Sequence, residues 1–209
     1  MKIDLENKSN KLLFLLLLAD FVFIIIHCVF RLHLLLNARF SIEQDFGYAE
    51  IYQFIKEYWV VVLLFIAAVK RRHFIYFSWA LLFLYLLFDD VFQFHETLAC
   101  YFASCLNLPS IFHLRAQDIG ELGVSVFFGF LLFAFIWVLY LFSDRAAKQL
   151  SRHLFILVAL LAFFGVLVDM LHIVLPWGES ILALIEDGGE MLMMSIIVWY
   201  VFNLKFDAR

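Results

Sequence analysis

Carboxylate side chains lie inside or at the edge of apolar segments at matching places in two parts of the chain. The first part starts at His73 and reaches Asp89 sixteen residues later, and the second starts at His153 and reaches Asp169 after the same interval. Each part then continues into an acidic stretch, Gln117–Glu121 in the first and Glu186–Glu190 in the second. Carboxylates are costly in apolar segments, so the duplicated set indicates a site.

Helical spacing lets several of these polar groups converge. Asp89, Gln93 and Glu96 are spaced i, i+4 and i+7, which places them on one stripe of a single helix. Asp169 and His172 are spaced i, i+3 and are therefore neighbours on a helix surface. We expect both helices to present these groups to a common centre.

We also expect these groups to lie at similar depths in a bilayer. Asp89 and Asp169 lie about 24 Å along a helix from the basic residues that start it, at about 1.5 Å per residue. In a hydrocarbon core about 30 Å thick, both lie just inside the far boundary. The two returning helices enter from that side at Glu121 and Glu190. Four helices thus bring carboxylates and one or two imidazoles to one layer.

Several carboxylates in a medium of low dielectric constant need a bound cation or shared protons. Acids and histidines from the four helices of a bundle are how dinuclear carboxylate metal sites are built. The predicted metal ligands are Asp89, Asp118, Glu121, Asp169, His172, Asp187 and Glu190. The candidates for a catalytic acid or base are His95, Glu96 and Glu186.

Divalent metal ions are the expected cofactors, and oxygen ligands with one histidine favour iron or manganese, with zinc as the alternative if fewer acids bind. Calcium alone would not need His172. The first copy has Phe92 where the second has His172, and a purely structural repeat does not need that imidazole.

Each candidate also has a structural interpretation. Acids near the membrane boundary (Glu96, Asp118, Glu186 and Asp187) can serve as helix N-terminal charges. His95 can be a hydrogen-bonded interface histidine, and Gly120, Gly188 and Gly189 can let helices approach closely. Asp20 lies alone in the middle of the first apolar run, where a partner or a proton path is expected.

The elements that must position these groups are membrane-spanning helices. Hydrophobic residues make up 66% of the chain and charged residues 16%, whereas soluble domains are about half apolar and a quarter charged. We predict an all-α integral membrane protein with six transmembrane helices, centred on the apolar runs Leu12–Phe30, Trp59–Val69, Phe74–Phe88, Val124–Phe142, Leu154–Val168 and Met191–Phe202. Residues 1–209 form a single membrane domain of three helical hairpins (1–70, 71–150 and 151–209), the last two an internal repeat and the first a degenerate copy.

Basic residues set the expected orientation. Eleven of the 15 Lys and Arg residues fall at the N-terminus, after the second and fourth spans and in the tail, which predicts that both termini are cytoplasmic. Fourteen of the 19 carboxylates fall on the other side, so the site is expected to face the periplasm of a bacterial inner membrane. The net charge of −4 argues against a nucleic-acid partner.

Three functions fit this pattern. The first is a membrane metalloenzyme, an oxidoreductase or a metal-dependent hydrolase, that acts on a lipid-like or small hydrophobic substrate from the lipid bilayer. The second is a proton- or cation-coupled transporter or channel that uses the same acids, since duplicated units are common in transporters. The third is an assembly subunit whose acids bind basic residues of a partner. The spans carry no Pro or mid-helix Gly break, and the charges stop at the outer layer, which favours a site over a conduit.

Overall fold

The computed structural model describes residues 8–106, 110, 114–174 and 179–204, and every regular element within them is helical. The long helices are α1 (Lys8–Arg31), α2 (Tyr48–Arg71), α3 (Phe74–Phe92), α5 (Ala116–Leu141), α6 (Arg145–Ala162) and α8 (Glu179–Phe202). The shorter elements are the 3₁₀ turn η1 (Ala38–Phe40), α4 (Phe94–Leu106), the π-helical segment η2 (Phe163–Val168) and α7 (Asp169–Val174). The prediction of an all-α fold is confirmed.

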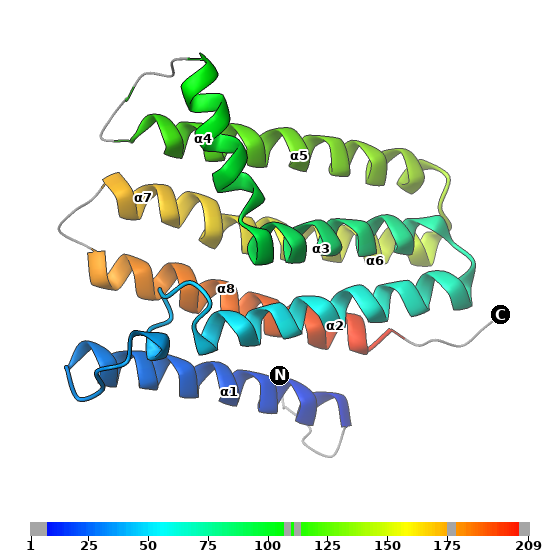
Figure 1. The fold of residues 1–209 in the computed structure, drawn as a ribbon. Coiled ribbons are helices and arrows are strands. Elements are labelled where there is room, and N and C mark those ends of the chain that lie inside the picture. The colour runs from blue at the N-terminus through cyan, green and yellow to red at the C-terminus, as the bar shows by residue number, and fades with distance from the viewer. Residues whose placement is uncertain (1–7, 107–109, 111–113, 175–178, 205–209) are drawn as a thin grey trace.

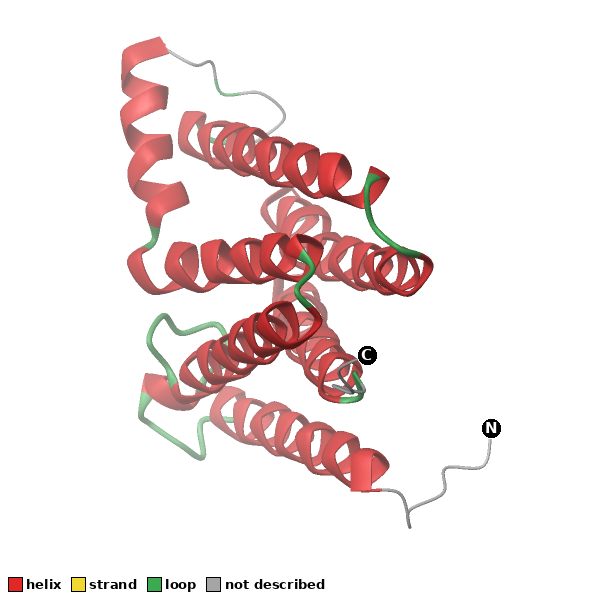
Figure 2. Ribbon diagram, turned by 90° about the vertical axis from the view of Figure 1, so that its right-hand side faces the viewer, coloured by secondary structure: helices red, strands yellow, loops and turns green. Residues whose placement is uncertain are grey.

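The long helices lie side by side in one bundle, with sequence neighbours antiparallel (Figure 1). α6, η2 and α7 follow one another as a single rod that packs against α8. The α2–α3 and α5–α6 turns lie at one end of this bundle, and the end of α3, α7 and the first turns of α8 lie toward the other. α4 crosses the direction of the other helices at the edge of the bundle, where it packs on α5 (Figure 2).

Five helical segments are long and apolar enough to cross a membrane: Ser9–Arg31, Tyr48–Arg71, Phe74–Phe92, Ala116–Leu141 and Arg145–Val174. α8 has 24 residues but is not one of the five, because Glu186, Asp187 and Glu190 make its N-terminal half strongly acidic. Large apolar side chains also cover the outside of the bundle, such as Phe130 and Trp137 on α5. The length of the helices and their apolar surface are compatible with a lipid bilayer environment.

The tightest part of the core lies where α2, α3, α6 and α8 meet. Trp79, Phe83, Leu64 and Ile197 are almost completely buried there. The indole Nε1 of Trp79 donates a hydrogen bond of 3.0 Å to the hydroxyl of Ser151, which ties α3 to α6. This part of the bundle is apolar and closely packed, whereas the polar groups of the two cavities lie toward the opposite end.

The polar end begins with an unpredicted break between α3 and α4. α3 ends at Phe92, and Gln93 adopts a left-handed conformation with φ of 50°, after which α4 starts in a new direction. The carboxylate of Asp89 accepts a 2.8 Å hydrogen bond from the backbone N–H of His95 and so fixes the new helix start. The prediction that Asp89, Gln93 and Glu96 share one helical stripe is therefore wrong.

A second irregularity lies in the rod of α6, η2 and α7, where the sequence had indicated an uninterrupted helix. η2 is π-helical, and it packs closely on α8 through two reciprocal contacts. The carboxylate of Glu190 lies against Gly165, and the ring of Phe164 lies against Gly189, so that a Cβ at either glycine would overlap its neighbour. The prediction that Gly189 allows close helix approach is confirmed.

Candidate metal centre and acidic cavity

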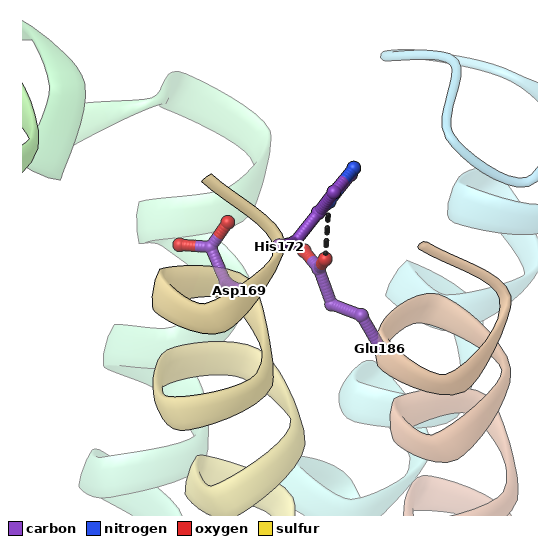
Figure 3. A group of neighbouring side chains, drawn as sticks. All are labelled: Asp169, His172 and Glu186. Atoms are coloured by element: carbon purple, nitrogen blue, oxygen red, sulfur yellow. Dashed lines mark hydrogen bonds and ion pairs between the residues drawn. The ribbon is translucent and has the colours of Figure 1, made fainter. Parts of the chain in front are cut away.

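Asp169, His172 and Glu186 form a group that can hold a metal ion. One ligand atom from each residue lies within 4.8 Å of the other two. Asp169 and His172 come from successive turns of α7, and Glu186 reaches across from α8 (Figure 3). The Nδ1 atom of His172 lies 3.0 Å from Oε2 of Glu186, so the imidazole and one carboxylate are already in contact.

Local structure explains how these three side chains meet. The i, i+3 spacing places Asp169 and His172 on one side of α7. α7 packs on α8, whose first turns lie at the same end of the bundle. All three residues are partly buried, so the group is reached from outside yet lies against protein. Two carboxylates and one imidazole leave coordination positions free for water or substrate, as in catalytic metal sites.

Asp89 and His95 form a separate pair, rather than joining this group. Oδ2 of Asp89 lies 3.2 Å from Nδ1 of His95, and Asp89 is 7% exposed. The hydrogen bond to the Asp89 carboxylate raises the pKa of His95 above its usual value. The copies therefore resemble each other in one respect, since each holds an aspartate next to a histidine of the same hairpin.

Asp118 is engaged within its own hairpin. Its fully buried carboxylate accepts hydrogen bonds from the backbone N–H of Arg115 at 2.7 Å and from the guanidinium of Arg115 at 2.7 and 3.0 Å. The bond to Asp118 raises the pKa of the Arg115 guanidinium further above its usual value. These contacts hold the first turn of α5, which corresponds to the alternative role of a helix N-terminal charge.

A cavity of about 670 Å³ opens beside the metal-binding group and shares Asp169 with it. One part of its wall is polar and comprises Gln53, Glu57, Tyr85, Asp89, Asp90, His95, Glu121, Ser125, Asp169 and Glu190. Another part is apolar and includes Leu82, Leu86, Leu132, Phe133, Val158 and Leu161. Among the predicted ligands, Glu121 and Glu190 thus lie on the cavity wall, where Glu121 accepts a 2.8 Å hydrogen bond from Gln117. The cavity can accept a molecule with a polar head and an apolar tail.

A smaller cavity of about 170 Å³, here called the vestibule, lies next to the larger one. Its wall is strongly acidic and comprises Ile42, Glu43, Gln44, Asp45, Glu50, Gln53, Phe54, Asp90, Gln93, His95, Glu96, Asp187 and Glu190. Asp187 and Glu96 are therefore vestibule residues, and burial raises the pKa of Glu96. Gln53, Asp90, His95 and Glu190 line both spaces, so the two cavities meet at these residues.

Asp20 has the partner that its isolated position predicted. The ammonium group of Lys56 lies 3.0 Å from the Asp20 carboxylate, and neither side chain is exposed. Lys56 also donates to the carbonyl of Met191 at 2.7 Å, and the hydroxyl of Ser195 donates to Asp20 at 2.5 Å. This network joins α1, α2 and α8 in the interior of the bundle.

Lys56, Glu57 and Gln53 on α2 were not among the predicted site residues. Their signal was nevertheless present, because they lie at i, i+3 and i+4 spacing with Val60 and Leu64, which are completely buried. A polar residue on the same stripe as buried apolar residues must point into the bundle. α2 therefore contributes an inward-facing polar surface to the cavity.

Comparison with known proteins identifies one family. The model of a family described as a domain of unknown function (DUF8692) matches residues 15–206, which is almost the whole chain. No curated protein and no solved structure matches the chain.

Proposed function

The chain belongs to the DUF8692 family, and we propose that it is a membrane metalloenzyme acting on a lipid-like substrate. The observation that carries this proposal is the group of Asp169, His172 and Glu186, whose ligand atoms lie within 4.8 Å of one another and which shares Asp169 with the wall of a cavity. The combination of a metal-binding group and an amphipathic cavity favours catalysis on a bound molecule.

The proposed membrane arrangement has six spans, with α8 as the sixth. α8 packs against α1, α2 and α6, so its acidic residues face protein. Its 24 residues also match the length of the other spans. The basic turns lie at one end of the bundle and the metal-binding group at the other, which supports a cytoplasmic and a periplasmic end in a bacterial inner membrane. The paired Asp89–His95 and Asp169–His172 support an internal repeat of two hairpins.

The chemistry of the donors favours iron or manganese, with zinc as the alternative, because two carboxylates and one imidazole are a predominantly oxygen ligand set. A metal at this position would activate water for hydrolysis or oxygen for oxidation. His95 and Glu121 line the cavity and are the groups best placed to exchange a proton with a bound substrate. Glu186, first considered as a base, becomes a ligand in this proposal.

The apolar wall of the cavity supports the substrate class. Leu132, Phe133 and Val158 would contact an acyl or isoprenoid chain, while the acids would surround its polar head. A cationic or hydroxylated head group would be preferred over a phosphate, since the described residues of the wall include several carboxylates and no Lys or Arg. The acidic wall therefore argues against an anionic phospholipid head group.

A cation-coupled transporter is the second candidate, and one observation favours it. The Asp20–Lys56 pair lies next to Glu57 on the cavity wall, so ionisable groups continue from the vestibule into the interior of the bundle. Cation or proton flux into liposomes, lost in Glu57→Gln, would support transport. Absence of flux in protein that turns over a lipid substrate would support the enzyme.

Metal analysis of the purified protein tests the proposal. After reconstitution with iron, manganese or zinc, we expect at least one bound metal per chain, lost in His172→Gln and Glu186→Gln. His153→Gln is the matched control, because His153 is an exposed histidine in contact with Tyr200 on α8, away from the metal-binding group. The proposal fails if no metal binds, or if His172→Gln and His153→Gln retain the same metal content.

A further inference from the structure

Two polar side chains of α2 line the larger cavity, and each has one buried oxygen without a hydrogen-bond partner among the described residues. Gln53 and Glu57 are one turn apart, and they are 8% and 2% exposed. Oε1 of Gln53 and Oε2 of Glu57 are buried and accept no hydrogen bond from any residue that the structure describes. Buried polar atoms are nearly always paired, so two unpaired oxygens on one cavity wall indicate a ligand.

Two further carboxylates face the same space. The side chain of Asp90, on α3, is in hydrogen-bonding contact with that of Glu57. Glu190, on α8, lines both cavities and lies against Gly165 on the opposite rod. Two carboxylates in contact must share a proton or bind a cation, and the unpaired amide oxygen of Gln53 favours the cation.

Lys56 does not provide the missing charge. Its ammonium group is within hydrogen-bonding distance of Asp20, the Met191 carbonyl and Ser195, which uses all three of its donors. Lys56 also lies over the ring of Tyr52, with 4.7 Å between Nζ and the ring centre. Lys56 and His95 therefore act on Glu57 and Asp90 only through longer-range electrostatic attraction, and no close ion pair joins either carboxylate to a basic side chain in the described part of the chain.

The vestibule provides a route for a cation to reach these oxygens. Its wall carries Glu43, Asp45, Glu50, Glu96 and Asp187, and it meets the larger cavity at Gln53, Asp90 and Glu190. A channel lined by one sign of charge raises the local concentration of the opposite ion. Cations are therefore drawn toward Glu57 and Asp90.

We propose that Gln53, Glu57 and Asp90 form a second, buried cation site, with Glu190 as a further charge on its facing wall. The ligand set consists of oxygen atoms, which suits a hard divalent cation such as Mg²⁺, Ca²⁺ or Mn²⁺. This site is separate from the Asp169–His172–Glu186 group, which contains an imidazole. A cation here neutralises the acidic end of α2 and fixes the polar wall of the cavity.

Titration with Mn²⁺ followed by electron paramagnetic resonance tests the second site in protein held in lipid nanodiscs. We expect two Mn²⁺ per chain in the wild type. His172→Gln should remove the ion with nitrogen coupling and leave the other, whereas the double variant Glu57→Gln/Asp90→Asn should do the reverse. Asp45→Asn is the control, because it removes a vestibule charge without removing a proposed ligand, and it should retain two ions.

Two substitutions of Gln53 distinguish the loss of a ligand from misfolding, because they are expected to change Mn²⁺ binding in opposite directions. Gln53→Leu should lower the Mn²⁺ content from two toward one, while Gln53→Glu adds a carboxylate and should lower the Kd of that ion about tenfold. One Mn²⁺ per chain that disappears in His172→Gln would overturn the second site and leave the proposed metal centre intact. Unchanged binding in both Gln53 variants would overturn it as well. Loss of only the Mn²⁺ ion without nitrogen coupling, in Gln53→Leu and in the double variant Glu57→Gln/Asp90→Asn, would support the second site.

Discussion

Replacing Lys56 with methionine tests whether the buried ion pair holds α1, α2 and α8 together. Methionine keeps most of the length of the side chain but cannot donate a hydrogen bond or carry charge. The carboxylate of Asp20 would then lie in the interior with only the Ser195 hydroxyl as a partner. The carbonyl of Met191 would also lose the donor that now lies 2.7 Å away.

The expected magnitude follows from the complete burial of both charges. Removing one member of a buried ion pair costs about 3–5 kcal/mol, because the other charge remains without compensation. We therefore expect Lys56→Met to lower the free energy of unfolding by about that amount. The double variant Asp20→Asn/Lys56→Met leaves no unpaired charge, so it should recover part of the loss, with a coupling energy of about 2 kcal/mol.

Reversible unfolding in mixed detergent micelles, followed by the fluorescence of the five tryptophans, would measure these differences. Lys11→Met is the matched control, because Lys11 lies on an exposed position of α1 and should change stability by less than about 0.5 kcal/mol. A free energy of unfolding of Lys56→Met within about 1 kcal/mol of the wild type would contradict this role of the ion pair, as would a double variant no more stable than Lys56→Met.

Two further predictions concern the polar end of the bundle. Gly165→Ala places a Cβ on the carboxylate of Glu190, the end of a flexible side chain, so we expect weaker Mn²⁺ binding at the second site with little change in Tm. Gly129→Ala, where a Cβ meets nothing within 4 Å, should leave binding unchanged, and equal binding in both variants would contradict the prediction. The Asp89 carboxylate raises the pKa of His95 above its unfolded value of about 6.5, so their ion pair stabilises the fold below that pH and fades as the pH rises through the folded pKa. Asp89→Asn should therefore lower Tm more at pH 5.5 than at pH 8.5, and an equal loss at both pH values would count against it.

The sequence was sufficient to predict contacts between site residues that lie within one turn of the same helix. Asp169 and His172 could be placed together because their i, i+3 spacing needs only one turn of helix. Glu186 belongs with them through the packing of α8 on α7, a contact that no periodicity contains. The sequence therefore marked it as an acid of the same layer, while its position next to His172 came from the fold.

The sequence was insufficient where the backbone departs from a regular helix. Gln93 is neither glycine nor proline, yet its left-handed conformation ends α3 and removes Glu96 from the stripe predicted for Asp89. The partnership of Asp20 with Lys56 joins residues 36 positions apart, and that distance is closed only by the packing of the bundle. The buried stripe of α2 indicates that Lys56 points inward, but it does not identify Asp20 as its partner.

The π-helical segment η2 makes the metal-binding group depend on the number of residues as well as on their identity. A π-helical turn holds one residue more than an α-helical turn, and each residue turns an α-helix by about 100°. If Phe163–Val168 became α-helical without losing a residue, α7 would be rotated by about that angle, and Asp169 and His172 would face away from Glu186. Deletion of one residue together with a return to an α-helix would instead leave the orientation of α7 almost unchanged, because the π-helical turn holds one extra residue. The approach of Asp169 and His172 to Glu186 thus depends on where along the helix that extra residue is held, with every ligand unchanged.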